Sequence, residues 1–276
     1  MHEWDNQAIA DKLLEIADLL EQQEANPFRV NAYRRAARTV AAHPEPIAAL
    51  AEREGTEGLD HLPTIGRSIA LAIQEMLRTG RWQQLERLRG TLDPEQVFQS
   101  IPGVGAELAR RIHEVLEIES LPELELAAHD GRLEQVPGLG PRRARMIAAA
   151  LGQMLQRRPA RPQRAAAEPA VELLLDVDRE YREKGARGEL RKIAPRRFNP
   201  SRQAWLPILH TQRGDWHFTA LFSNTARAHE LRKTDDWVVL YFHTDHGPEA
   251  QRTVVTETSG PLQGRRVVRG REAESR

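Results

Sequence analysis

The residues best suited to chemistry in this sequence are glycines in a twelve-residue pattern that occurs three times. The copies read LPTIGRSIALAI from Leu62, IPGVGAELARRI from Ile101 and VPGLGPRRARMI from Val136. In each copy the second residue is Pro, the fifth is Gly, the ninth is Ala and the twelfth is Ile. Glycine allows a tight turn and the close approach of another molecule, and N–H groups at the start of a following helix attract an anion. The pattern therefore predicts the binding of phosphate groups.

The pattern also predicts the elements that hold these glycines. The residue before a proline is pushed out of the α region, which ends a preceding helix, and the Ala and Ile are spaced to lie on one face of a new helix. Each copy is interpreted as a helix-hairpin-helix motif; a turn used only for packing is the alternative, which the threefold repetition disfavours. The residues expected to bind the DNA backbone at these turns are Gly66, Arg67, Ser68, Gly103, Gly105, Ala106, Gly138, Gly140, Arg142 and Arg143.

Composition limits the other chemistries. The chain of 276 residues has no cysteine, which excludes disulfides, thiol catalysis and cysteine-bound zinc. Lysine occurs only at positions 12, 184, 192 and 233, so residues 13–183 offer arginines that suit phosphate but no amine for a Schiff base. The net charge is zero, so DNA binding would depend on where the positive charge lies. No apolar run is long enough to cross a membrane, and we expect a cytoplasmic, nucleoid-associated protein.

Helical periodicity dominates the first half of the chain. It predicts an all-helical module over residues 1–90, which contains the first hairpin, a buried Phe28 and a loop at 55–58. Residues 91–156 form a second module, in which two hairpins 35 residues apart (Ile101 to Val136) hold nearby phosphates of one strand. The helices of the first module, apart from that of the hairpin, are expected at residues 5–23, 28–42, 47–54 and 81–89.

The second half differs in composition and in hydrophobic pattern. Residues 157–169 are almost entirely Pro, Arg and Ala, which is typical of an exposed linker. Residues 170–276 then predict a small α+β domain with an antiparallel sheet and a helix at its start. The fold class is therefore multidomain, with an all-α helix-hairpin-helix half followed by this α+β domain. The β-like runs are residues 205–211, 216–222, 237–244, 251–258 and 265–270.

Residues 5–155 resemble the N-terminal part of X-family DNA polymerases. The matching stretches are NPFRVNAYRRAARTV, LPTIGRSIALAIQEMLRTGRWQQLERL and the segment from Ile101 to Ile147. The resemblance implies binding of the sugar-phosphate backbone without reading of bases. It also implies contacts of Arg29 and Tyr33 with the 5′-phosphate of a DNA gap, next to a basic rim that includes Arg34. A monovalent cation at hairpin carbonyls, near Ile65 and Val104, is implied as the one possible cofactor.

The departures from that family bear on catalysis. The family's lyase uses a lysine in the helix after the first hairpin, and this position is Ala72 here; two supporting lysines correspond to Ser68 and Asp60. The polymerase palm is missing, because no Gly-Ser-x-Arg-Arg element follows the linker. Asp176-x-Asp178 has the spacing of a metal-binding pair, but it lies in a helical run, where a solvated face is the alternative. We therefore expect no catalytic residue and no bound divalent metal.

The C-terminal domain resembles no family. His243-x-Asp245-His246 has a composition suited to a metal, with structural histidines as the alternative. A basic, turn-rich stretch over residues 185–203 is a second candidate for phosphate contacts. The basic residues in it are Arg187, Arg191, Lys192, Arg196 and Arg197.

Three functions remain open. The first is a sequence-nonspecific DNA-binding protein that prefers gapped, nicked or 5′-phosphorylated DNA and acts in repair. The second is a repair enzyme, either a polymerase or lyase relative or a metal-dependent nuclease whose C-terminal domain is catalytic. The third is a protein-interaction adaptor whose hairpins only pack helices. The lack of a lyase lysine and of palm motifs favours the DNA-binding protein over the repair enzyme.

Overall fold

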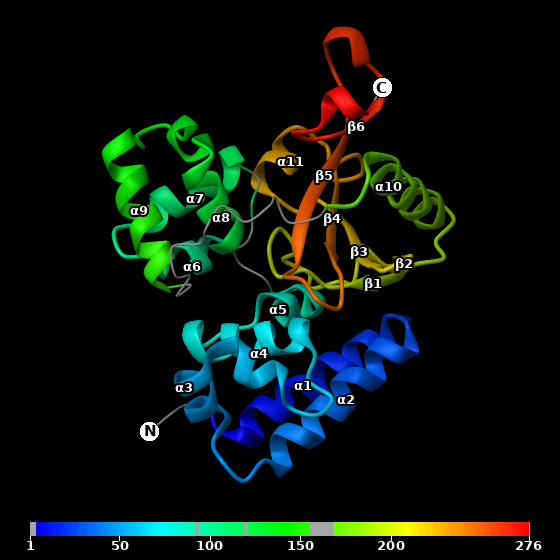
Figure 1. The fold of residues 1–276 in the computed structure, drawn as a ribbon. Helices are drawn as coiled ribbons and strands as arrows, with labels where there is room; N and C mark the ends of the chain where they lie inside the picture. Colours follow the sequence, from blue (N-terminus) through cyan, green and yellow to red (C-terminus); the bar gives the residue numbers. More distant parts are fainter. Residues whose placement is uncertain (1–3, 92–93, 117, 119–120, 155–167, 276) are drawn as a thin grey trace. The chain divides into compact units, whose positions relative to one another are not determined.

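The structure, a computed structural model, describes residues 4–91, 94–116, 118, 121–154 and 168–275 (Figure 1). The chain divides into two compact units. Unit 1 comprises Met1–Thr91, Pro169–Ser223 and Thr234–Arg276, and unit 2 comprises Leu92–Glu168 and Asn224–Lys233. No helix among the described residues is both long and apolar enough to cross a membrane. Most of the linker predicted at 157–169 lies outside the described residues.

Five helices form the first part of unit 1. Their ends follow from local sequence, because Asp5 and Asn26 cap the first two helices by accepting hydrogen bonds from amides of the first turn. Gly80 and Gly90 end the last two helices in the left-handed conformation. The helices are α1 (Asn6–Gln22), α2 (Pro27–Ala42), α3 (Ile47–Asp60), α4 (Arg67–Thr79) and α5 (Gln83–Arg89).

The rest of unit 1 contains helix α10 (Val171–Ala186), a six-stranded sheet and two short 3-10 helices, η2 (Gly260–Leu262) and η3 (Glu272–Glu274). Neighbouring strands in the sheet are consecutive in sequence and antiparallel, which makes a simple meander in the order β1 to β6. The strands are β1 (Arg191–Ile193), β2 (Leu206–Arg213), β3 (Trp216–Phe222), β4 (Val238–His243), β5 (Ala250–Thr256) and β6 (Arg266–Val268).

Both faces of this sheet are covered. On β4, Val238, Leu240 and Phe242 pack in a core with α10, which lies along one face (Figure 1). The alternate residues Val239 and Tyr241 belong to a second core with the apolar faces of α1 to α5. Side chains alternate across a strand, so one strand serves both cores. The first helical module and the sheet therefore form one folding unit.

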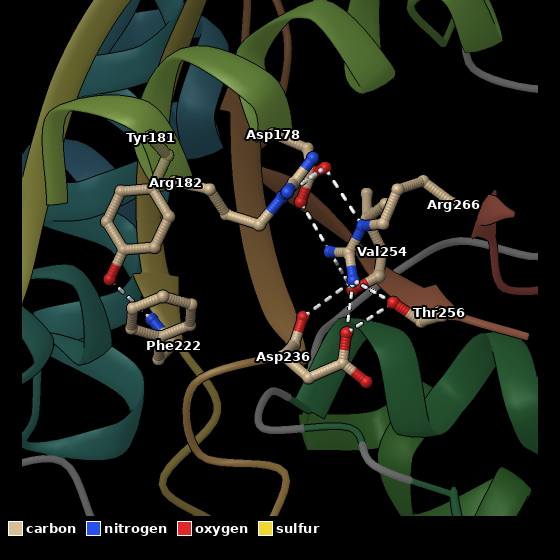
Figure 2. A network of polar contacts seen from close by, with 8 residues as sticks. All are labelled: Asp178, Tyr181, Arg182, Phe222, Asp236, Val254, Thr256 and Arg266. Carbon is tan, nitrogen blue, oxygen red and sulfur yellow. Dashed lines mark hydrogen bonds and ion pairs between the residues drawn. The ribbon is translucent and has the colours of Figure 1, made fainter. Parts of the chain in front are cut away.

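Helix α10 is fixed to the sheet by a buried ion pair. Asp178 has no exposed surface, and its carboxylate accepts hydrogen bonds from Arg266 Nη2 at 2.5 Å and from Arg182 Nε at 3.0 Å (Figure 2). Arg266 Nη1 also donates to Asp236 Oδ1 at 2.5 Å. The solvated-face interpretation of Asp178 was therefore wrong, because β6 supplies an arginine that a helical pattern cannot reveal.

Tyr181, one turn further along α10, adds a second polar anchor. Its hydroxyl accepts from the N–H of Phe222 at 2.8 Å (Figure 2). It also donates to the carbonyl oxygen of Pro207 at 2.9 Å. Both groups belong to strands of the sheet. A buried hydroxyl with both roles satisfied holds its helix in register as well as in place.

Unit 2 has a core of its own. Phe98, Ile112 and Leu124 are completely buried within it, together with Ile101 and Val136, which begin the second and third repeats. The apolar first residue of each repeat thus anchors its turn to the core. The elements of unit 2 are α6 (Pro94–Gln99), α7 (Ala106–Leu116), α8 (Leu121–His129), η1 (Arg132–Gln135), α9 (Pro141–Met154) and α11 (Ala226–Glu230).

The predicted fold class is confirmed, with helical N-terminal domains followed by an antiparallel sheet. Three local predictions were wrong. Helix α3 continues through residues 55–58 with a kink at Gly55, whose φ is 67°. Phe28 is 84% exposed because it sits in the first turn of α2, before the buried face begins. Strand β1 was missed because it has only three residues and two of them are exposed.

Candidate nucleic-acid interface

The three repeats fold into the same turn. In each one the N–H of the fourth residue donates to the carbonyl oxygen of the first, at 3.2 Å for Ile65 to Leu62, 3.0 Å for Val104 to Ile101 and 3.0 Å for Leu139 to Val136. Proline at the second position and a positive φ at the third define a type II turn. The fifth residue then starts a helix, since its carbonyl oxygen accepts from the N–H of the repeat's Ala, at 3.0 Å in Gly66, 2.9 Å in Gly105 and 3.1 Å in Gly140.

The third residue, rather than the fifth, carries the unusual backbone conformation. Its φ is 66° in Thr64, 86° in Gly103 and 83° in Gly138. The expectation that the fifth-position glycines make the tight turn was wrong, because their φ values lie outside the left-handed region. Thr64 adopts this conformation without being glycine, and its hydroxyl is hydrogen-bonded to that of Thr39 at 2.8 Å.

The fifth-position glycines instead face open space. A Cβ built on Gly66, Gly105 or Gly140 would meet no heavy atom within 4 Å. Neither backbone conformation nor internal packing therefore requires glycine here, and the missing side chain leaves the first amides of the next helix accessible. Helix α4 has no side-chain cap at Gly66, and glycine supplies none before α7 or α9. Such uncapped N-termini attract anions.

The second and third turns are held side by side. Arg111, on α7 behind the second turn, donates from Nη1 to the carbonyl oxygen of Pro137 in the third turn at 2.7 Å. A Cβ on Gly138 would lie 2.8 Å from the same nitrogen. Gly138 is therefore needed for two reasons, its φ and the space that Arg111 occupies. The pairing of two turns that the sequence predicted thus has a specific side-chain bridge.

Charge differs between these two turns. Arg142 and Arg143 are exposed on the first turn of α9, with no ion pair to other described residues. Pro141 has no N–H, so the hydrogen-bond donors at this turn are the amides of Gly140 and Arg142 and the side chains of the two arginines. At the second turn, Glu107 pairs with Arg110 at 2.7 Å, which holds the pKa of Glu107 below its usual range. The exposed residues there, Gly103, Gly105 and Ala106, offer only backbone groups for hydrogen bonding.

The first turn is contacted by the sheet. The N–H of Ser68 donates to the carbonyl oxygen of Asp245, in the β4–β5 connection, at 3.4 Å. Arg67 is half-buried beside it. One of the amides expected to bind phosphate therefore has a partner inside the protein.

Arg29 and Tyr33 also lie where the helices meet the sheet. Tyr33 is buried and its hydroxyl donates to Gln84 Oε1 at 3.0 Å. Nε and Nη2 of Arg29 are buried, and neither donates a hydrogen bond to a described residue. Arg34 points elsewhere, to ion pairs with Glu21 at 2.7 Å and Asp18 at 3.2 Å on α1.

The sheet presents neutral histidines to Arg29. Burial, together with the charges of Arg29 and Arg87, lowers the pKa of His210 to about 3. Burial and Arg29 also lower the pKa values of His217 and His243, whose rings are register neighbours with centroids 5.2 Å apart. The uncompensated guanidinium nitrogens therefore face groups that do not add positive charge at neutral pH.

Candidate groups for catalysis do not converge. Asp245 Oδ1 lies 3.1 Å from His217 Nε2, so it pairs with β3 rather than with His243 and His246. Within the described residues, no three His, Asp or Glu side chains form a cluster that could hold a metal ion. Ala72 is buried in the core of unit 1.

Comparison with known proteins agrees with this geometry. Residues 4–82 match a helix-hairpin-helix domain family, and residues 95–153 match a SAM-like helix-hairpin-helix tandem family. The N-terminal half is a helix-hairpin-helix region like that of X-family DNA polymerases. A DNA polymerase/3′-5′ exonuclease PolX of Bacillus subtilis is 28% identical over 51% of this chain. A Holliday junction branch migration complex subunit RuvA of Methylobacterium radiotolerans is 33% identical over 34% of it.

The similarity is partial on both sides. The aligned part covers 24% of the PolX chain and 46% of the RuvA chain. It supports the two helix-hairpin-helix regions, whose turns are those described above. Sequence reasoning found the residues of these turns but missed Arg111, since nothing in a helical charge pattern distinguishes an arginine that bridges to a distant carbonyl.

Proposed function

We propose that the protein binds the sugar-phosphate backbone of DNA without sequence specificity, through the second and third turns. The observation that carries this proposal is the pair of type II turns joined by Arg111, each followed by an open glycine and an uncapped helix. Backbone amides at a glycine turn can contact a phosphate but have no reach into a groove, so such contacts position DNA rather than read its bases. The PolX and RuvA relatives, by their names, act on DNA, which supports DNA as the ligand.

We further propose a preference for gaps, nicks or ends that carry a 5′-phosphate, with a role in repair. Its support is Arg29. Two of its guanidinium nitrogens are buried and donate no hydrogen bond to a described residue, and arginine is the side chain that favours bidentate contacts with phosphate. Tyr33 lies next to this guanidinium, whose charge opposes the rise in the tyrosine pKa that burial causes.

A monovalent cation at the hairpins belongs to the same proposal. No backbone N–H within the described residues donates to the carbonyl oxygen of Ile65 or of Val104. Both oxygens therefore retain lone pairs suited to a hard cation. A higher DNA affinity in potassium than in lithium chloride, at equal ionic strength, is the expected result.

The test is a binding panel measured by fluorescence anisotropy. Matched intact, nicked and one-nucleotide-gapped duplexes, with and without a 5′-phosphate, are titrated at several salt concentrations. We expect affinity to fall steeply with salt, with a slope near −0.9 for each phosphate contacted, and gapped DNA with a 5′-phosphate to bind most tightly. Arg29→Ala should remove the 5′-phosphate preference and leave intact duplex binding unchanged. An affinity that does not change with salt concentration would refute backbone binding. Equal affinities for gapped duplexes with and without a 5′-phosphate would refute the 5′-phosphate site.

A further inference from the structure

A second basic surface lies in unit 1, on the connection between β1 and β2. Residues 194–204, here called the basic loop, contain Arg196, Arg197 and Arg202, and no Asp or Glu occurs between Leu190 and Gly214. Arg196 and Arg202 are exposed, and neither side chain has an ion pair with another described residue. Arginines elsewhere in this unit are commonly neutralised, as in the pairs Arg34–Glu21, Arg213–Glu180 and Arg81–Glu86. The basic loop thus carries uncompensated charge.

The basic loop is built around one buried side chain. Asn199 is 7% exposed, and its Nδ2 donates to the carbonyl oxygens of Pro195 and Gln203, both at 2.9 Å. Its Oδ1 accepts from the N–H of Gln203 at 3.2 Å and from the hydroxyl of Ser201 at 3.3 Å. A side chain that closes the loop from both ends fixes the positions of the residues between them.

The basic loop is also fastened to the first helical module. The N–H of Arg196 donates to the carbonyl oxygen of Gly90, at the end of α5, at 2.7 Å. Gly90 has a φ of 76°, and a Cβ on it would lie 2.7 Å from the carbonyl oxygen of Ala194. The basic loop is therefore attached to the C-terminal end of α5.

This rigid loop displays an aromatic ring. Phe198 is 46% exposed, and both Phe198 and Arg202 have positive φ values, of 51° and 52°, which are unfavourable for residues other than glycine. The guanidinium carbon of Arg197 lies 5.3 Å from the centre of the Phe198 ring. The strained backbone holds this exposed ring beside the arginines of the loop, where a ligand can reach it.

We propose that the basic loop is a binding site for single-stranded nucleic acid. Arg196 and Arg202 contact backbone phosphates, and Phe198 stacks on an unpaired base. Base stacking on an aromatic side chain beside a basic groove is the general mode by which proteins hold single strands without reading sequence. An intact duplex or an acidic protein would engage the arginines but would have no use for the exposed ring. This site is separate from the hairpin turns and does not depend on their function.

The experiment uses the full-length chain and a fluorescein-labelled oligothymidylate of about 20 nucleotides, long enough to exceed a typical single-strand site. Phe198→Ala and Phe198→Leu should each weaken single-strand binding by about tenfold, the effect of losing one stacked base, and Phe198→Trp should retain it. The double variant Arg196→Ala/Arg202→Ala should weaken binding and reduce the salt slope by about 1.4, because each phosphate contact on a single strand contributes about 0.7. Arg265→Ala removes an exposed arginine outside the loop and should bind as the wild type does.

Melting temperatures show whether each variant is folded. If Phe198→Ala does not fold, Phe198→Leu takes its place in the comparison. Intact duplex of the same length is the second probe, and Phe198→Ala should leave its affinity unchanged. Wild-type affinity for the oligothymidylate in both the Phe198→Leu and the double-arginine variants would overturn the proposal. So would an equal loss on single strand and duplex in the Phe198 variants. Loss of duplex binding in hairpin variants tests the proposed function separately.

Discussion

Arg111 on α7 donates a 2.7 Å hydrogen bond to the carbonyl oxygen of Pro137, in the turn before α9. Through this contact the spacing of the second and third turns depends on one side chain. It also places a guanidinium where a Cβ on Gly138 would need to be. The bridge therefore couples two positions that are 26 residues apart in sequence.

The first prediction is a double-mutant cycle on this bridge. Gly138→Ala should destabilise unit 2 by about 1–3 kcal/mol, because it combines an unfavourable φ with a clash. In an Arg111→Ala background the clash is gone, so the same substitution should destabilise less, by at least about 0.5 kcal/mol. Denaturant unfolding measures all four proteins. Strict additivity would mean that Arg111 moves aside without cost.

The second prediction separates folding from binding within one turn. Gly105→Ala and Gly140→Ala place a methyl group in open space, so their cost in stability should be at most about 1 kcal/mol. The same methyl should block the approach of a phosphate and lower duplex affinity by about tenfold or more, as expected for the loss of charge-assisted hydrogen bonds. Arg132→Ala, whose guanidinium is paired with Asp130 in the same unit, is the control. Unchanged affinity in both glycine variants would remove these turns from the interface.

The third prediction concerns the buried carboxylate on α10. Asp178→Asn should destabilise the protein by about 3 kcal/mol, because it leaves the Arg266 charge less compensated in a buried site. Asp176→Asn, two residues away and partly exposed, should cost no more than about 1 kcal/mol even though it pairs with Arg213. Chemical denaturation compares the two. Similar losses for both would mean that burial of Asp178 has little energetic consequence.

The fourth prediction is a pH dependence of stability. The folded protein holds the pKa of His210 at about 3, below the value near 6.5 expected when unfolded. As pH falls below about 6.5, the unfolded chain gains a proton that the folded chain refuses, so stability decreases by up to about 1.4 kcal/mol per pH unit. Arg29 and Arg87 are the charged groups that face this ring, and Gln23 and Thr219 are its hydrogen-bond partners.

His210→Gln keeps a hydrogen-bonding side chain and removes the titration. Its stability should fall less steeply than that of the wild type between pH 6.5 and 5, a window in which His217 and His243 still contribute. Glu75 acts in the opposite direction, since burial raises its pKa to about 7 and makes lower pH favourable for folding. The comparison of variant with wild type cancels that contribution. Parallel pH profiles for the two proteins would contradict a neutral, buried His210.

Much of the helical half was predictable because its signals are local. A proline, a glycine and two small-to-apolar positions specify the turn and the first buried face of the next helix, and each repeat of the pattern folded in this way. The position of the positive φ was misassigned because Thr64 occupies it in the first copy and hides the glycine signal. Phe28 was misplaced because helical periodicity extends into a first turn that the core does not reach.

The relationship between the first helices and the sheet was not predictable from local patterns. The run Val238 to Phe242 is apolar on both strand faces, which indicates that something covers each face but not what. The covering elements are α10 on one face and α1 to α5 on the other, and α1 to α5 lie far earlier in the chain. The Asp178–Arg266 pair and the Asp245 contact with the first turn are likewise products of tertiary packing.

Unit 1 is discontinuous in sequence, because most of unit 2 lies between its two main segments along the chain. Suppose that the chain is cut once between α9 and α10 by a protease site engineered there. If the two fragments were independent domains, they would separate on a sizing column. Here, however, the N-terminal and C-terminal fragments share the core that holds Val239, Tyr241 and the apolar faces of α1 to α5. They should remain associated until denaturant is added. The protein would then behave as a complemented pair of chains, in which neither the N-terminal helices nor the sheet is expressible alone in a folded form.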